Sequence, residues 1–140
     1  MRKSLIAILF SCVLATIIYS CQNAAQVKQD VYYVNGRDLY IKHCQNCHGA
    51  KGEGLGALTP ALTDTVFLKA NREKLACFIR NGIKDTITVN GQQYEGTMPA
   101  FPELYDIDIA QLLVYITNSF GNNQGMYTPE EVSTVLKTSR

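Results

Sequence analysis

The chain has 140 residues, of which 46% are hydrophobic and 18% are charged, and its formal net charge is +1. This length and this balance predict one domain that can form a hydrophobic core. The chain contains no basic tract of the kind that binds nucleic acid, so we expect no nucleic-acid partner.

Residues 1–20 are predicted to be an export signal. Arg2 and Lys3 form a basic start, and the apolar run from Leu5 to Ile18 is shorter than the roughly 20 residues that a membrane span needs. The following Tyr-Ser-Cys resembles the end of a bacterial lipoprotein box. We therefore expect Cys21 to carry lipid and to hold the protein on the periplasmic side of a bacterial membrane. The alternative is an uncleaved short anchor.

Residues 21–34 are predicted to be a tether and lead-in, because residues 22–30 are polar and show no periodicity. A helix is predicted to begin near Asn35, a favourable N-cap residue with Asp38 three positions later. This helix opens the domain predicted for residues 35–122.

Residues 44–48 read Cys-Gln-Asn-Cys-His, which is the attachment pattern of c-type haem. Each thiol adds to one vinyl group of the porphyrin, and the histidine gives an imidazole nitrogen to the iron. A zinc site would need four ligands, but His43 is the only other histidine and no second cysteine pair exists. A thioredoxin-like pair would not require the histidine. The motif predicts one haem c held by Cys44 and Cys47, with His48 as an axial ligand.

With Tyr40 four residues before Cys44, this motif resembles the class I cytochromes c. The resemblance implies an all-α fold in which three main helices surround one covalent haem. It also implies that Gly36 and Tyr40, one helical turn apart, pack the N-terminal helix against Leu112 and Tyr115 of the last core helix.

The glycine-rich stretch of residues 49–56 is not a phosphate-binding loop, because no Gly-Lys-Ser/Thr follows it. Pro60 lies 12 residues after His48. In the resembling family a proline at this place offers its carbonyl to the haem histidine, which fixes the imidazole tautomer. The alternative is an ordinary loop proline.

A second helix is predicted over residues 71–81, with Asn71 as its cap and Gly82 as its stop. Residues 86–94 predict a small β-hairpin, because Thr and Val residues flank Asn90 and Gly91. A hairpin inserted before a methionine loop resembles the haem domains associated with terminal oxidases and nitrite reductases.

Met98 lies in a loop between Gly96 and Pro99, about 50 residues after the haem motif. Most methionines fill cores, but a methionine between glycine and proline in a loop is less expected to do so. The resemblance implies that Met98 is the second axial ligand, on the haem face opposite His48.

The last core helix is predicted over residues 107–119, with Asp106 as its cap and Gly121 as its stop. Residues 123–140 are predicted to be a tail with a short helix. Thr128 would cap that helix, and Pro129 would occupy its first position.

The resemblance implies a one-electron carrier of a bacterial respiratory chain, in which His48 and Met98 stay bound while the iron changes between ferric and ferrous. It implies redox proteins as partners, such as a membrane oxidase or reductase complex. The sequence shows no nucleophile with a base and no suitable carboxylate pair, so we do not expect an enzyme. The alternative is a peroxidase-like enzyme or a gas-binding haem protein whose sixth iron position is open.

Overall fold

The computed structural model of the chain describes the backbone of residues 2–138 and the side chains of residues 6, 9–14 and 24–138. It contains two compact units, Met1–Val31 and Tyr32–Arg140. Within the described residues, no helix has a stretch that is both long and apolar enough to cross a membrane. The side chain of Cys21 lies outside the described part, so its lipid attachment stays a prediction.

Helix α1 extends from Arg2 to His43 and passes through the position at which we expected a helix to begin. Asn35 is an exposed residue inside this helix, so the predicted N-cap is wrong. Residues 22–34 are helical rather than irregular. The physical reason is that no glycine or proline lies between Cys21 and Asn35 to end a helix.

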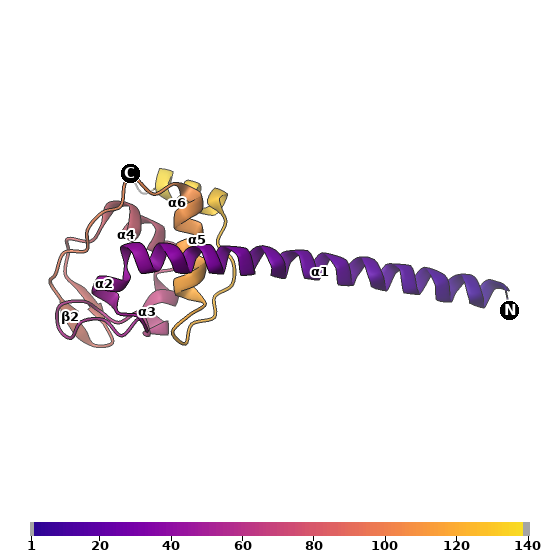
Figure 1. Cartoon of the computed structure of the whole chain (residues 1–140), viewed down its shortest axis with the longest axis horizontal. Helices are drawn as coiled ribbons and strands as arrows, with labels where there is room; N and C mark the ends of the chain where they lie inside the picture. Colours follow the sequence, from indigo (N-terminus) through magenta and orange to yellow (C-terminus); the bar gives the residue numbers. More distant parts are fainter. Residues whose placement is uncertain (1, 139–140) are drawn as a thin grey trace. The chain divides into compact units, whose positions relative to one another are not determined.

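In the second unit, the C-terminal part of α1 crosses α5 (Asp106–Thr117), as Figure 1 shows. The two helices meet closely at Gly36, where an added Cβ would overlap the carbonyl oxygen of Gln111 and lie 2.9 Å from the Cβ of Tyr115. Tyr40 is fully buried, and its ring centroid lies 5.2 Å from that of Tyr115. Leu112 is also fully buried on α5. The glycine–aromatic contact implied by the resemblance is therefore present.

Helix α5 is the most deeply buried helix of this unit, with Ile109, Ala110 and every residue from 112 to 117 buried. Its N-cap is Tyr105 rather than the predicted Asp106. Asp108 accepts a hydrogen bond from the Tyr105 backbone N–H at 2.9 Å, while Asp106 forms an ion pair with Arg80 at 2.8 Å. Asp106 does not cap the helix because the helix begins one residue earlier than predicted, which makes Asp106 its first helical residue.

The predicted tail helix is present as α6 (Pro129–Thr138). Its cap is Thr128, whose Oγ1 accepts a hydrogen bond from the backbone N–H of Glu131 at 3.2 Å. Val132 is buried, and α6 packs against α5 and α4 (Leu75–Asn81).

Helix α4 forms the C-terminal part of the helix that we expected over residues 71–81, and a separate helix that was not predicted, α3 (Thr65–Ala70), precedes it. Asp64 starts α3, because its Oδ1 accepts hydrogen bonds from the backbone N–H groups of Val66 at 2.9 Å and Phe67 at 3.1 Å. Asn71 ends α3 instead of starting α4, so that predicted cap is wrong. The predicted stop at Gly82 is correct.

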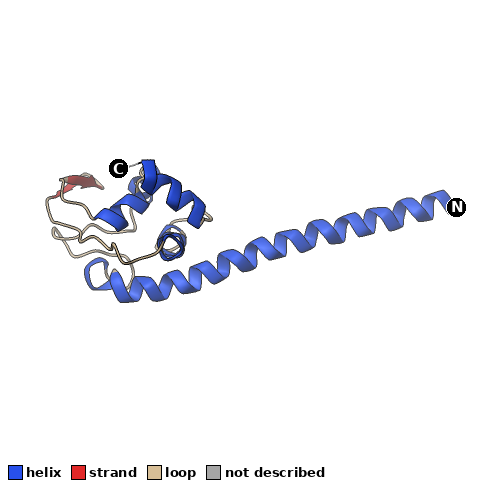
Figure 2. Ribbon diagram, turned by 90° about the horizontal axis from the view of Figure 1, so that it is seen from above, coloured by secondary structure: helices blue, strands red, loops and turns tan. Residues whose placement is uncertain are grey.

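The predicted hairpin consists of β1 (Ile87–Val89) and β2 (Gln92–Tyr94), which pair antiparallel. The turn residues Asn90 and Gly91 have φ values of 50° and 75°, as a two-residue type I′ turn requires. Figure 2 shows the hairpin in red at the edge of the helical unit. The Asn90 N–H donates to Oδ2 of Asp64 at 2.9 Å, so one carboxylate holds both α3 and the hairpin turn.

Gly36→Ala should destabilise the folded protein by about 2 kcal/mol, because the new methyl group would force α1 away from the Gln111 carbonyl. An alanine in an unobstructed helix would instead stabilise it by about 1 kcal/mol. Urea unfolding followed by circular dichroism measures the change.

Asn35→Ala is the matched control for this substitution. Because Asn35 is exposed within α1, we expect a change of no more than about 0.5 kcal/mol. A loss near 1 kcal/mol, which is typical of removing an N-cap, would contradict the continuous helix.

Candidate haem site

The cysteine–histidine motif forms the turn in which α1 passes into α2 (Gln45–His48). The Cys44 N–H donates to the Tyr40 carbonyl at 2.9 Å, and the His48 N–H donates to the Cys44 carbonyl at 2.9 Å. These bonds carry the helical backbone through the motif. Cys44 is buried and Cys47 is exposed, and the side chains of Cys44, Cys47 and His48 line the same pocket.

Cys44 does not resemble the reactive cysteine of a thioredoxin-like redox pair, whose pKa is lowered. Burial raises the pKa of the Cys44 thiol to about 12, and the neighbouring Cys47 contributes to this increase. Cys44 is therefore a neutral thiol at ordinary pH. An attachment point inside an apolar pocket is consistent with this state.

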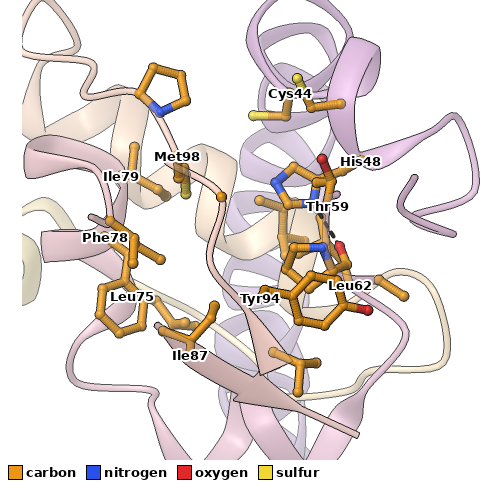
Figure 3. A pocket seen from close by; sticks show the side chains of 18 of the residues that line it. Cys44, His48, Thr59, Leu62, Leu75, Phe78, Ile79, Ile87, Tyr94 and Met98 are labelled. Atoms are coloured by element: carbon orange, nitrogen blue, oxygen red, sulfur yellow. Dashed lines mark hydrogen bonds between the residues drawn. The ribbon is translucent and has the colours of Figure 1, made fainter. Parts of the chain in front are cut away.

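The imidazole of His48 is oriented by Pro60, whose carbonyl oxygen lies 3.1 Å from Nδ1. A carbonyl can only accept, so Nδ1 carries the proton and Nε2 keeps its lone pair. Burial lowers the pKa of His48, and the bond to Pro60 opposes this change. The result is a neutral imidazole with one nitrogen free to bind a metal. Figure 3 marks this hydrogen bond with a dashed line.

The glycine-rich loop brings Pro60 back to the histidine. The Gly54 N–H donates to the His48 carbonyl at 2.8 Å, and the Leu55 N–H donates to the Thr59 carbonyl at 3.0 Å. Gly54 has a φ of 73°, and a Cβ there would lie 2.5 Å from the Thr59 oxygen. Glycine is required at this position because the loop crosses itself without room for a side chain.

Met98 lies on the other wall of the pocket. Figure 3 shows the side chains of His48 and Met98 on opposite sides of the pocket. The Met98 backbone is fixed by a two-way pairing with Ile83, in which the Met98 N–H donates at 2.9 Å and its carbonyl accepts at 3.1 Å. The structure thus places the side chains of Cys44, Cys47, His48 and Met98 around one pocket.

The remaining walls of the pocket are apolar and come from α3, α4, the hairpin and α5. None of the described side chains that line it belongs to Asp, Glu, Lys or Arg. Two thiols at one edge and two donors on facing walls suit a planar apolar macrocycle whose central iron needs two axial ligands. Residues from several elements form these walls: Leu62, Phe67, Phe78, Ile79, Val89 and Leu113.

The hairpin was predicted from the sequence, but its role in covering the pocket was not. Val89 and Tyr94, one from each strand, are buried and line the pocket, so the hairpin forms part of its wall.

Ile83 and Phe101 also line the pocket, and the sequence analysis did not identify them. The Phe101 ring meets His43 edge-on, with 5.6 Å between their centroids. The alternation of Ile87 and Val89 around Thr88 is a sequence signal that could have revealed one apolar strand face, whereas no local signal marks Ile83 or Phe101.

The fold and this site define a class I c-type cytochrome. Residues 33–116 match the family model described as cytochrome C oxidase, cbb3-type, subunit III, and the chain belongs to this cytochrome c family. The family binds haem c covalently, so the predicted cofactor is confirmed.

Two curated proteins are similar to this chain. Cytochrome c-552 of Thermus thermophilus is 29% identical over 107 residues, which cover 70% of this chain and 81% of the relative. A second cytochrome c-552, from one specified strain of the same species, is also 29% identical over 107 residues, and the match covers 70% of this chain and 72% of that relative.

Asp64→Ala should lower the free energy of unfolding by about 1–2 kcal/mol, because α3 loses its cap. It should also speed hydrogen exchange at the Asn90 amide, which loses its acceptor. Asp85→Ala, at an exposed site just before β1, should change stability by no more than about 0.5 kcal/mol. Equal effects of the two substitutions would contradict the shared role of Asp64.

Proposed function

We propose that this protein carries single electrons in a bacterial respiratory chain, with haem c attached through Cys44 and Cys47 and its iron bound by His48 and Met98. The observation that carries this proposal is the position of two donors, the free Nε2 of His48 and the Met98 thioether, on facing walls of one apolar pocket. Family membership supports electron transfer as the general role.

The protein's own residues suit a reversible one-electron change. A bound haem c supplies an iron that changes between ferric and ferrous. The Pro60 carbonyl holds the His48 tautomer and makes the imidazole more basic. The thioether of Met98 is a soft donor that favours ferrous iron and raises the reduction potential. The apolar walls would leave few competing ligands near a bound iron, so the imidazole and the thioether could both stay in place when its charge changes.

The alternative, a peroxidase-like or gas-binding protein, requires an open sixth position. Such a position would need Met98 to lie away from the iron, whereas its backbone is paired on both sides with Ile83. His43 does not offer a distal base, because it directly precedes Cys44 and its ring packs against Phe101. These contacts favour the carrier.

We also propose that the redox partners include a membrane oxidase or reductase complex. The family description, which names an oxidase subunit, supports this partner class. Cys47 is exposed at the attachment edge, and Leu58, which also lines the pocket, is 72% exposed. A haem edge that reaches the surface here would allow the brief, small-interface docking typical of electron-transfer pairs.

Export and a lipid anchor at Cys21 would place the haem unit beside such a complex on the periplasmic side of a bacterial membrane. The sequence features of residues 1–21 support this location.

Met98→Ala should open the sixth iron position to water. We expect loss of the weak ferric absorption band of methionine–iron bonding, a lower reduction potential because ferrous iron loses a soft ligand, and new binding of carbon monoxide. Absorption spectroscopy and a redox titration of the purified holoprotein measure these changes.

Met126→Ala is the matched control. Met126 packs against the core outside the pocket, and its backbone oxygen accepts a hydrogen bond from Arg72 at 2.8 Å. This substitution should reduce stability without altering the spectrum or the potential. If Met98→Ala changes nothing and the wild type already binds carbon monoxide, the sixth position is open and the alternative function is correct.

Cys21→Ser should release a soluble haem protein with an unchanged spectrum and potential, because the lipid anchor and the haem site are chemically separate. One acyl chain binds membranes weakly and two or more bind them firmly. Membrane fractionation and mass spectrometry of the N-terminus provide the measurement. A wild-type chain that keeps Met1, or that is fully soluble, would contradict lipidation.

A further inference from the structure

The position of Met98 depends on a short segment at the end of α4. This helix ends at Asn81, and Gly82 follows with a φ of 73° and a ψ of −177°. The extended turn places Ile83 alongside Met98, where their backbones exchange hydrogen bonds of 2.9 Å and 3.1 Å. These bonds fix the peptide groups on both sides of the Met98 side chain.

Gly82 lies directly against the backbone that it helps to position. A Cβ added to Gly82 would overlap the carbonyl oxygen of Met98, and it would lie 2.9 Å from the Ala100 nitrogen and 3.0 Å from the Pro99 carbonyl carbon. All three atoms are backbone atoms, which cannot rotate away as the end of a side chain can. The methionine loop therefore reaches its place only because residue 82 has no side chain.

The same loop is attached to α4 at two further points. The Phe101 N–H donates to the Ile79 carbonyl at 3.1 Å, and the Arg80 guanidinium donates to the Pro102 carbonyl at 3.1 Å. Phe78 and Ile79 of this helix also line the pocket. The helix end and the loop therefore form one connected wall, and a shift of either one moves the Met98 thioether.

The geometry points to Gly82 and Ile83 as positioning residues for iron ligation, an inference that rests on the proposed role of Met98 as the sixth ligand. A neutral thioether is a weak ligand for ferric iron, and water or a basic side chain competes with it. Because the Met98 backbone is held in place before ligation, the free energy of binding the iron does not include the entropy cost of ordering the loop. The Gly82–Ile83 segment thereby sets how firmly Met98 excludes other ligands.

The test compares two glycines in the same region of backbone conformation. Gly82 and Gly91 have φ values of 73° and 75°, so alanine meets a similar backbone strain at both. Nothing lies within 4 Å of a Cβ at Gly91, whereas a Cβ at Gly82 would strike the Met98 loop. The difference between Gly82→Ala and Gly91→Ala therefore reports the contact with that loop.

In the Gly82→Ala holoprotein we expect loss of the weak methionine–iron band, a lower reduction potential and carbon monoxide binding to the ferrous form. Gly91→Ala should match the wild type in all three. A folded, haem-loaded Gly82→Ala protein that also matches the wild type would overturn the inference.

A measurement on the wild-type holoprotein applies even where Gly82→Ala does not fold. The amide protons of Ile83 and Met98 should be protected from hydrogen exchange while the methionine–iron band is present. The amides of Ile83 and of residue 98 should also stay protected in folded Met98→Ala holoprotein, because the backbone pairing does not depend on ligation. Amides that exchange freely while the band persists, or that lose their protection in folded Met98→Ala holoprotein, would overturn the positioning role.

Met98→Ala, measured in parallel, separates the ligand role from the positioning role. If this variant keeps the band and the potential, Met98 is not the ligand, and both the proposed function and the inference are wrong. If it loses them while folded Gly82→Ala keeps them, only the positioning role is wrong.

Discussion

The burial of Tyr40 links the packing of the helices to the position of the haem motif. Its ring is fully buried between Tyr115 of α5 and Phe120, at centroid distances of 5.2 Å and 5.4 Å. Its hydroxyl donates to the Gly49 carbonyl at 2.6 Å, directly after His48, and burial raises its pKa well above the usual value. The neutral phenol therefore keeps this hydrogen bond at ordinary pH. Whatever fixes Tyr40 against α5 also fixes the turn that carries both cysteines and the histidine.

The two walls of the pocket are built in different ways. On the histidine wall, the contacts are local: Cys44 and His48 lie within one helical turn, and Pro60 returns through a glycine loop only 12 residues long. On the methionine wall, the backbone of Met98 pairs with that of Ile83, and the intervening residues include the whole hairpin. The imidazole is oriented by a hydrogen bond from its own ring, whereas the thioether is placed through its backbone, by a helix end, a glycine and a paired segment.

The Asp64 carboxylate links the hairpin to α3, and both elements form part of the pocket wall. Both oxygens of Asp64 are used, one by the first turn of α3 and the other by the hairpin turn. Phe67 on α3 and Val89 on β1 then face the same apolar space. An apolar enclosure would strengthen the electrostatic effect of the pocket's side chains on a bound haem iron, because little water would be present to screen it. The small insertion before the methionine loop is therefore part of the site.

The sequence by itself determined the haem motif, the hairpin at Asn90 and Gly91, and the tail helix capped by Thr128, because each depends on contacts within a few residues. It did not determine where α1, α4 and α5 begin. Asn35 and Asn71 are good cap residues by type, but a residue can cap a helix only where that helix begins. The start of a helix depends on tertiary packing: α1 continues through Asn35, and Asn71 ends α3 instead of starting α4. Met98 could be named from its loop, but its place opposite His48 was decided by the tertiary structure, because the two residues are 50 positions apart and meet only through the packing of the helices between them.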